Sequence, residues 1–224
     1  MLCCLSSRPV VTLSVMASTV IAAASIASLR TDAHASAVQA PPAKGAESAS
    51  GPVTYDVDDV HSKALFRVQH LGAGQFWGVF DDMKGTATYE PGKTLSLDVS
   101  IDTGSVDSGN SNLDEHLESP DFFDAKEFPS MTFKSASAEM KSANLWHVTG
   151  DLTIRGKTKR VTVPIEVTGA SSTGMGVRAG FEAVFNIKRS EYGVSYGVDN
   201  GALGDETRVI VAIEGIKQEP AAAK

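Results

Sequence analysis

Three histidines, His61, His70 and His116, are among the side chains of this sequence that could do metal or acid–base chemistry. Imidazole is a common zinc ligand and titrates near neutral pH, so three such rings brought to one end of a fold could hold a metal ion. Their spacing, however, matches neither an H-x-H nor an H-E-x-x-H motif. We therefore predict no metal site, and the histidines remain candidates for polar contacts.

Carboxylate and hydroxyl groups show no clearer catalytic arrangement. Four acidic side chains lie within one short stretch, namely Asp114, Asp121, Asp124 and Glu127. Their spacing identifies no paired general acid and base, and solvation at the surface accounts for them. Ser190 does not lie in a G-x-S-x-G motif, and the glycine pairs at 72–74 and 174–176 lack the following helix of a nucleotide-binding loop. We predict no catalytic residue and no cofactor.

The charge balance argues against a nucleic-acid-binding protein. The 224-residue chain has 20 Lys and Arg residues against 27 Asp and Glu, a net charge of −7, and contains no long run of basic residues that could neutralise phosphates. Its basic segment 155–160 is interpreted as a solvated hairpin tip, with transient contact to a lipid headgroup or membrane as the alternative. Cys3 and Cys4 are the only cysteines, so the body of the chain has no disulfide.

The N-terminal segment is predicted to be an export signal. Arg8 precedes an apolar stretch over 10–26, and Ala33-His34-Ala35 fits the small-x-small rule for signal peptidase. An uncleaved anchor is the alternative, but the many Ala, Ser and Thr residues make the stretch a poor membrane span. We predict a cleaved signal peptide at 1–35 and a periplasmic or secreted protein.

The remaining chain is predicted to contain one folded domain. Residues 36–52 are rich in Ala, Pro, Ser and Gly, which is typical of a disordered linker. The domain is expected over 53–217, and a short disordered tail over 218–224. About 165 residues are an ordinary length for a single domain.

Apolar and polar residues alternate with a period of two through most of the predicted domain, as in half-buried antiparallel strands. Strands are predicted at 64–70, 75–80, 86–89, 95–102, 130–140, 145–154, 161–167, 177–187 and 209–213. Two turns between strands are predicted. One is a type II turn at 90–93, where Pro91 and Gly92 take the central positions, and the other is a hairpin turn at 155–159. This many antiparallel strands can bury their apolar faces only in a β-sandwich or a closed barrel, and the short connections between consecutive strands favour the barrel.

One helix interrupts the strands, at 110–119. Leu113 and Leu117 lie one turn apart on its apolar face, acidic residues occupy its early turns, and Pro120 ends it. The predicted fold is therefore an all-β, antiparallel, eight-stranded barrel with one short helix. A barrel of eight strands is either filled by its own side chains or holds one small or elongated ligand.

Six phenylalanines are candidates for the barrel interior, and the same residues could form a packed core or contact a ligand. Small neighbours, Ala64, Gly78, Ala179 and Ala183, would leave room for a chain-like ligand. His70 alternates with apolar residues onto one face, so it is either a buried polar contact for a ligand head or a core histidine hydrogen-bonded to the backbone. The pair Phe122-Phe123 either covers a barrel end, gates the entry of a ligand, or belongs to the core.

Four blocks of this sequence resemble the YceI-like family, and they occur in the family's order. The first block is Y-x-V-D-x-x-H-S at 55–62, followed by F-x-V-x-H at 66–70 and G-x-F at 78–80. The second is D-x-H-L-x-S-x-D-F-F-D at 114–124, followed by F-P-x-M-x-F-x-S at 128–135. The others are V-x-G-x-L-T-I-x-G-x-T-K at 148–159 and I-K-R-S-E-Y-G at 187–193.

The resemblance implies a lipocalin-like barrel in an exported protein that binds a long isoprenoid or acyl lipid inside the barrel. The residues expected to contact the ligand are Phe66, Val68, His70, Phe76, Phe80, Phe133, Phe181, Phe185 and Arg189. We expect binding, transport or sequestration without catalysis. An enzyme acting on a bound lipid and a filled barrel serving as a stress-response interaction module are the rival hypotheses, and a homodimer is left open.

Overall fold

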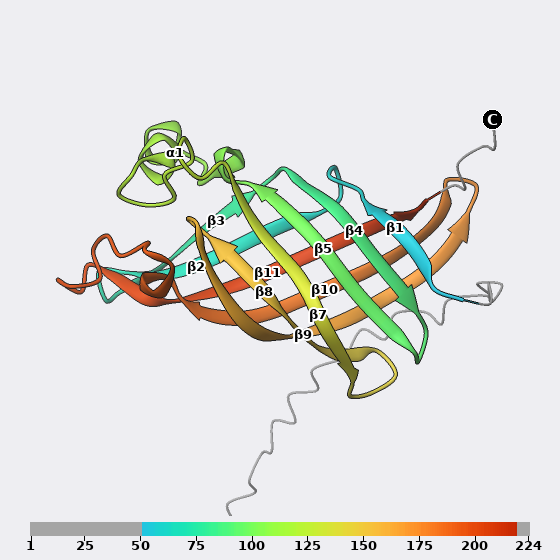
Figure 1. Cartoon of the computed structure of the whole chain (residues 1–224). Helices are drawn as coiled ribbons and strands as arrows, with labels where there is room; N and C mark the ends of the chain where they lie inside the picture. Colours follow the sequence, from blue (N-terminus) through green and yellow to red (C-terminus); the bar gives the residue numbers. More distant parts are fainter. Residues whose placement is uncertain (1–50, 219–224) are drawn as a thin grey trace, which may run out of the picture. The chain divides into compact units, whose positions relative to one another are not determined.

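The structure, a computed structural model, describes residues 51–218 as eleven strands, one α-helix and two short 3₁₀ helices (Figure 1). The strands are β1 (Val53–Val57), β2 (Lys63–His70), β3 (Gly74–Phe80), β4 (Met83–Glu90), β5 (Thr94–Asp102), β6 (Val106–Asp107), β7 (Ser130–Met140), β8 (Leu145–Ile154), β9 (Lys157–Thr173), β10 (Gly176–Lys188) and β11 (Leu203–Lys217). The helices are η1 (Thr103–Ser105), α1 (Ser111–Glu118) and η2 (Arg189–Tyr192). Within this part of the chain, none of the helices has the length and apolar character needed to cross a membrane.

Eight of the strands form a closed antiparallel barrel. Their order around the ring is β1-β4-β5-β7-β8-β9-β10-β11, and β11 pairs again with β1. The closing pairs place Tyr55 opposite Lys217 and Val57 opposite Gly215. Closure leaves the ring without an unpaired edge along which another strand could add. The prediction of an eight-stranded antiparallel barrel with one short helix is confirmed.

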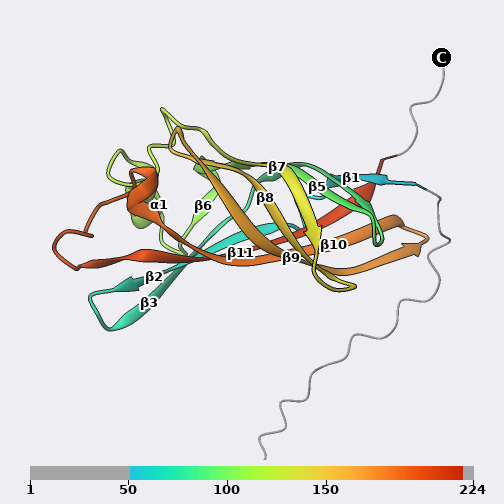
Figure 2. The same cartoon turned by 60° about the horizontal axis from the view of Figure 1, so that its bottom comes forward.

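The other three strands extend the wall at one end of the barrel. β2 pairs with the first part of β11, from Thr207 opposite Val68 to Ala212 opposite Lys63. β2 and β3 form a hairpin that projects from the barrel (Figure 2). The two residues of β6 add to β3 at Val79 and Phe80. β11 is long enough to pair with β2 over its first part and with β1 over its last part.

The residue pattern explains why the strands have one apolar face. In β5, Leu95, Leu97 and Val99 are buried and the residues between them are exposed or half-buried. Successive side chains of a strand point to opposite faces, so this alternation places one face in the barrel and the other in solvent. The inward faces form one continuous core cluster.

Helix α1 is capped at its N-terminus by Asn110 and at its C-terminus by Ser119. The side chain of Asn110 accepts a hydrogen bond from the backbone N–H of Leu113 at 3.2 Å, and Ser119 ends the helix with its N–H bonded to the carbonyl of His116. Leu117 is buried. The predicted helix at 110–119 is confirmed, with its first and last residues acting as the caps.

The turn between β8 and β9 is shorter than the predicted turn at 155–159. It contains only Arg155 and Gly156, both with positive φ, as a two-residue hairpin turn of this handedness requires. Lys157 already pairs with Ile154 in the ladder. Polar residues can continue a strand where its faces meet solvent, and hydropathy alone does not separate such residues from a loop.

Five further strand assignments were missed or shortened, including β4, which begins at Met83 and not at 86, and β9, which ends at Thr173 and not at 167. The sequence pattern indicated no strand at β1 or β6, which are short, and it placed the start of the last strand at 209 although β11 begins at Leu203. The type II turn at 90–93 agrees with the structure, in which Gly92 has a φ of 73° and Lys93 donates to the carbonyl of Glu90. The predicted signal peptide at 1–35, residues 36–50 of the linker and the tail from 219 lie outside the described residues.

Candidate functional site

The barrel encloses an apolar cavity of about 680 Å³. This volume falls within the range of small-molecule binding sites, and such sites are mostly apolar with a few polar groups. All nine residues predicted to contact a ligand line the cavity: Phe66, Val68, His70, Phe76, Phe80, Phe133, Phe181, Phe185 and Arg189. The structure brings them to one cavity, while their contact with a lipid stays a prediction.

Strands β2 and β3 supply an aromatic wall of this cavity. The ring of Phe66 lies 5.5 Å from that of Phe80 and 6.1 Å from that of Phe76, measured between centroids. Phe123, which follows α1, packs edge-on against Phe66 and Phe80 at 5.9 and 5.1 Å. Because Phe123 also lines the cavity, the pair Phe122-Phe123 both packs in the core cluster and covers part of the interior.

One end of the cavity is closed by tyrosines. Phe181 packs edge-on against Tyr55 and Tyr89, with ring centroids 6.4 and 5.9 Å apart. Both tyrosines are buried, and burial raises the pKa of each phenol above its ordinary value. Phe181 lines the cavity whereas the two tyrosines lie behind it. This end is therefore a packed floor.

The other end opens between the β2–β3 hairpin, α1 and the segment 193–202, and we call this opening the mouth. Its lining residues His70, Gln75 and Tyr196 are exposed, so the cavity reaches the surface here. His116 packs edge-on between Phe122 and Tyr196, with centroids 5.0 and 5.2 Å away. The imidazole Nε2 of His116 lies 3.0 Å from Oδ2 of Asp121.

The prediction that His70 could be a core histidine is wrong. β2 runs outward to the mouth, so its last inward-facing position is exposed even though it follows the buried residues Phe66 and Val68. The alternative, a buried polar contact for a ligand head, is wrong about burial, whereas His70 does line the cavity and its contact with a ligand stays a prediction. Alternation indicates which face a side chain occupies, but not how far along the barrel it lies.

The small residues make room for different neighbours. Ala64 and Ala183 line the cavity, as the prediction of free space requires. Gly78 instead accommodates the ring of Phe66, since a Cβ placed on it would lie 2.6 Å from Cε1 of that ring. Ala179 is buried opposite Gly215 and lies outside the lining. Two of the four residues therefore line the cavity directly, and Gly78 leaves space for the ring of Phe66, which is itself a lining residue.

Arg189 is buried at the cavity wall and holds the segment 193–204 in place. Its Nε donates to the carbonyl of Gly204 at 2.8 Å, Nη1 to that of Val194 at 3.0 Å, and Nη2 to that of Tyr196 at 2.9 Å. Burial lowers the pKa of this guanidinium, and the negative charge of Asp205 opposes the shift. Most of its N–H groups are therefore committed to backbone carbonyls. This arrangement favours a positioning role for Arg189 over the predicted contact with a ligand headgroup.

Thr207 is a polar cavity residue that the sequence analysis missed. Its side chain is 6% exposed, and its hydroxyl has no hydrogen-bond partner among residues 51–218. It lies on the inward face of β11, which continues with Val209, Val211 and Ile213. A threonine in a row of inward-facing aliphatic residues was the signal that could have identified it, because buried hydroxyls are usually bonded.

The basic segment 155–160 is bound to the protein itself. Arg155 donates from Nη1 to the carbonyls of Phe122 and Gly193 at 3.0 and 2.8 Å. Lys159 pairs with Glu191 and Arg160 with Asp151. These three cations already have partners, whereas the fourth, Lys157, is exposed and forms no ion pair within residues 51–218. Most of the positive charge of this segment is therefore used inside the protein, which does not favour the headgroup or membrane alternative.

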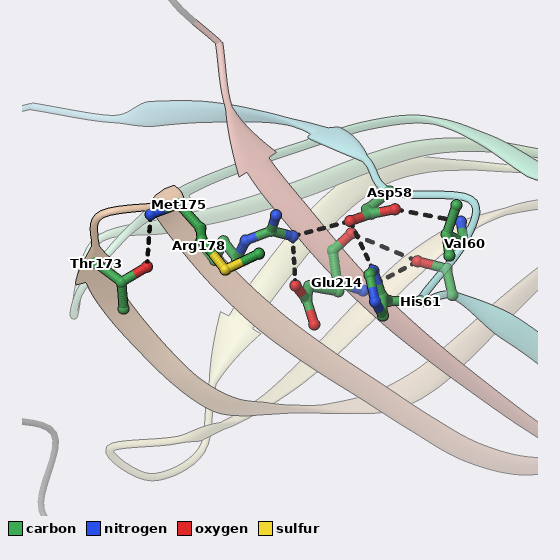
Figure 3. A network of polar contacts seen from close by, with 8 residues as sticks. Asp58, Val60, His61, Thr173, Met175, Arg178 and Glu214 are labelled. Carbon is green, nitrogen blue, oxygen red and sulfur yellow. Dashed lines mark hydrogen bonds and ion pairs between the residues drawn. The ribbon is translucent and has the colours of Figure 1, made fainter.

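The three histidines do not form a common metal site. His70 and His116 lie at the mouth, whereas His61 belongs to a polar network beside β10 and β11 (Figure 3). There Asp58 lies between His61 and the guanidinium of Arg178, which also pairs with Glu214. Ligand atoms of Asp58, His61 and Glu214 lie within 4.8 Å of one another, but Arg178 supplies the cation of this network.

The network strongly stabilises the ionised form of Asp58. Hydrogen bonds from His61 and then from Arg178 lower the pKa of this carboxyl from 3.8 to about 2. The hydrogen bonds that Arg178 donates to Asp58 and Glu214 raise the pKa of its guanidinium. Asp58 follows β1 and Glu214 lies on β11, so the ion pairs reinforce the seam at which the barrel closes.

Comparison with known proteins identifies relatives of this barrel. The family model described as the YceI-like domain matches residues 55–215. Protein YceI of Salmonella arizonae is 36% identical over 168 residues, which cover 73% of this chain and 86% of that protein. Protein YceI of Salmonella paratyphi B matches to the same extent.

Solved structures show the same architecture. BcnA of Burkholderia cenocepacia matches with a TM-score of 0.64 and 30% identity, over 70% of this chain and 98% of that one. The Campylobacter jejuni YceI protein matches with a TM-score of 0.61 and 29% identity, over 68% and 90% of the two chains. A polyisoprenoid-binding domain from Saccharophagus degradans shares the fold, with a TM-score of 0.59 and 16% identity over 74% and 99%. The chain belongs to the YceI-like family.

Proposed function

We propose that this protein binds the chain of a long isoprenoid or acyl lipid inside its barrel, and carries or sequesters it without changing it chemically. The observation that carries the proposal is the cavity, which is apolar, closed by the tyrosine floor and open at the mouth. A chain-like ligand could enter at the mouth with its apolar end leading. Its polar end would then remain near His70 and His116.

The free energy available from burial favours a long ligand. Each CH₂ group removed from water contributes about 0.8 kcal/mol, so ten such groups contribute about 8 kcal/mol. Association costs roughly 4–15 kcal/mol in lost translational, rotational and conformational freedom. A short chain would therefore bind weakly, and useful affinity requires a chain that fills most of the 680 Å³ cavity.

The lining favours binding over catalysis on the bound lipid. All lining residues lie within 51–218, and none of them is acidic. His116 is the lining histidine with a carboxylate neighbour, Asp121, and the interaction lies at the mouth beside exposed side chains. A catalytic acid and base facing each other across the cavity would have favoured the enzyme hypothesis.

A lipid carrier of this kind is expected to act in an aqueous compartment outside the cytoplasm. We propose a periplasmic or secreted location, which is supported by the signal-like sequence at 1–35. The Saccharophagus domain, described as polyisoprenoid-binding, supports the choice of ligand class through its shared fold. The filled-barrel hypothesis is less well supported because the interior contains a large cavity.

Native mass spectrometry of protein loaded with prenols of increasing chain length tests the proposal. We expect one prenol per chain, with occupancy that rises with prenol length until the cavity is full. Ala183→Leu places a larger side chain in the cavity and should lower occupancy, whereas Ala136→Leu, at an exposed position on β7, should leave it unchanged. Absence of bound prenol in the unsubstituted protein at every length would refute the proposal.

A further inference from the structure

The outer wall beside the mouth has an apolar row where a barrel in water normally has polar residues. Val184, Ile210, Leu65 and Val79 are consecutive cross-strand partners on β10, β11, β2 and β3. All four side chains are half-buried, and none belongs to the core cluster or to the residues packed against it, although Leu65 also contributes atoms to the cavity lining. They alternate with inward-facing residues, so the row faces outward.

The neighbouring outward row, one step closer to the mouth, contains two arginines and a tryptophan. Arg208 is the cross-strand partner of Arg67, and Arg67 is the partner of Trp77. Trp77 is 44% exposed, and the guanidinium carbon of Arg67 lies 5.7 Å from the centre of its indole ring. Two adjacent rows on four neighbouring strands therefore form a patch that consists of Val184, Ile210, Leu65, Val79, Trp77, Arg67 and Arg208.

The register places two arginines directly opposite each other on β11 and β2, while the guanidinium of Arg67 lies over Trp77 on β3, the strand on the other side of β2. Like charges directly opposite each other on neighbouring strands destabilise a sheet. Neither Arg67 nor Arg208 has a carboxylate within salt-bridge distance among residues 51–218. Within residues 51–218, Glu206 is the next outward-facing residue to Arg208 on β11, and its carboxylate accepts a hydrogen bond from Asn186 instead of pairing with either arginine. Anions bound at this face would compensate the charges of both guanidinium groups.

The hairpin tip adds an exposed apolar side chain beside the patch. Leu71 has a φ of 50°, a conformation that costs a residue other than glycine roughly 1 kcal/mol, and its side chain is 66% exposed. The tip is held in place, because the N–H of Leu71 donates to the carbonyl of Ala202 at 2.8 Å. The fold thus fixes a leucine in solvent at the edge of the mouth.

We propose that this patch and Leu71 dock the protein on an anionic phospholipid surface. Tryptophan and arginine suit the membrane interface, since the indole has an apolar body with a polar N–H and the guanidinium pairs with phosphates. Docking would place Leu71 and Trp77 among the headgroups and Arg67 with Arg208 on lipid phosphates. The mouth would then lie against the membrane, so a lipid could pass between membrane and cavity without crossing water.

The membrane explains the arginine pair better than a second copy of this chain does. A two-fold contact made with the same patch would bring the arginines of both copies close together, and this repulsion would add to that within each copy. An anionic bilayer offers many phosphates to the same two groups. The proposal extends the proposed lipid-binding function, because it names the surface from which the ligand comes.

Binding to lipid vesicles tests the proposal. Every variant is expressed from the full sequence and then purified, so that the variants differ only at the substituted positions. Phosphatidylcholine vesicles with and without phosphatidylglycerol serve as probes. We expect stronger partitioning onto the anionic vesicles, and a loss of about tenfold or more for Arg67→Glu/Arg208→Glu. The matched control Lys84→Glu/Lys134→Glu reverses two exposed charges on β4 and β7, and should lose much less.

Tryptophan fluorescence gives a second readout. The chain has two tryptophans, and Trp146 is already buried, so a blue shift on vesicle addition should come from Trp77. Trp77→Phe should abolish the shift. Leu71→Ser should weaken partitioning several-fold, whereas Met175→Ser, at an equally exposed apolar position distant in sequence from the mouth, should not.

Three results would overturn the proposal. Equal vesicle binding by the patch variant and its control would show that the patch does not dock, and so would an unchanged Trp77 spectrum. A dimer that dissociates on Arg67→Glu/Arg208→Glu would identify the patch as a protein interface.

Prenol uptake from detergent micelles, which needs no bilayer, should remain unchanged in patch variants. Vesicle binding without prenol uptake would refute the proposed function and leave the docking surface standing.

Discussion

The ring of Phe66 occupies the space in which a side chain at Gly78 would lie. The two residues are cross-strand partners on β2 and β3, and a Cβ on Gly78 would approach Cε1 of the ring to 2.6 Å. From this position the ring contacts Phe76, Phe80 and Phe123. The size of the cavity therefore depends on a residue that has no side chain.

Gly78→Ala should displace the Phe66 ring into the cavity and destabilise the protein by about 1–3 kcal/mol, as overpacking of a core does. Prenol occupancy in native mass spectra should fall, and urea denaturation should give the change in stability. Gly74→Ala is the matched control, because a Cβ there would meet no atom within 4 Å. If the two variants behave alike, the steric explanation is incorrect. Restoration of prenol binding by Gly78→Ala/Phe66→Leu would support it.

Thr207→Val should make the empty barrel more stable and weaken its hold on polar-headed lipids. The substitution keeps the shape and removes a buried hydroxyl without a partner in the described structure, which should raise the free energy of unfolding by roughly 1 kcal/mol. If the hydroxyl bonds to the ligand, a prenol should lose about 3–10-fold in affinity, while the hydrocarbon of equal length loses nothing. Competition between these two ligands measures the effect, and Thr207→Ser is the control that keeps the hydroxyl.

Arg189→Met should loosen the segment 193–204 at the mouth. Carbonyls of Val194, Tyr196 and Gly204 would lose their donor, at a cost of about 2–4 kcal/mol. Exchange of backbone amide hydrogens should accelerate more in this segment than in β5, because Arg189 does not contact β5. Arg189→Lys keeps the charge but cannot reach three carbonyls, so it should restore little protection. A variant that lost only headgroup selectivity, with unchanged exchange, would show a direct role in binding instead.

The Asp58 network should make stability sensitive to acid. The folded-state pKa of Asp58, about 2, lies below the unfolded value of 3.8, so its stabilisation is complete above pH 4. The contribution is lost as the pH falls through 3.8 towards 2. Because the network is partly exposed, it amounts to about 1–2 kcal/mol. Asp58→Asn should remove this part of the acid sensitivity in urea titrations, and an unchanged difference between pH 5 and pH 2.5 would contradict the assignment.

The sequence predicted the barrel well because its signals are local. Alternation along β5, the caps of α1 at Asn110 and Ser119, and the Pro91-Gly92 turn each depend on a few neighbouring residues. It failed where local signals are weak. β1 and β6 are too short to show a period, and the charged start of β9 at Lys157 resembles a loop. The two-residue turn at Arg155-Gly156 was therefore extended by three residues.

The candidate site was predicted in its composition but not in its arrangement. All nine predicted residues line the cavity, and strand alternation accounts for eight of them because it fixes the face of a strand on which a side chain lies, whereas Arg189 belongs to a family motif and lies in η2. Their depth was not predictable. His70 is at the mouth, Phe181 is at the floor, and Arg189 is bound to backbone carbonyls whose positions depend on a segment several residues away.

The sequence by itself determined the antiparallel barrel, the inward faces of its strands and the family, because periodicity and motifs are properties of neighbouring residues. Only the tertiary structure decided that the barrel encloses a cavity, which end of it is open, and which cations remain unpaired. Cavity size depends on how side chains from distant strands meet, as with Phe66 over Gly78. The pairing of Arg67 with Arg208 arises from strand register across 141 residues of sequence, and no local pattern records it.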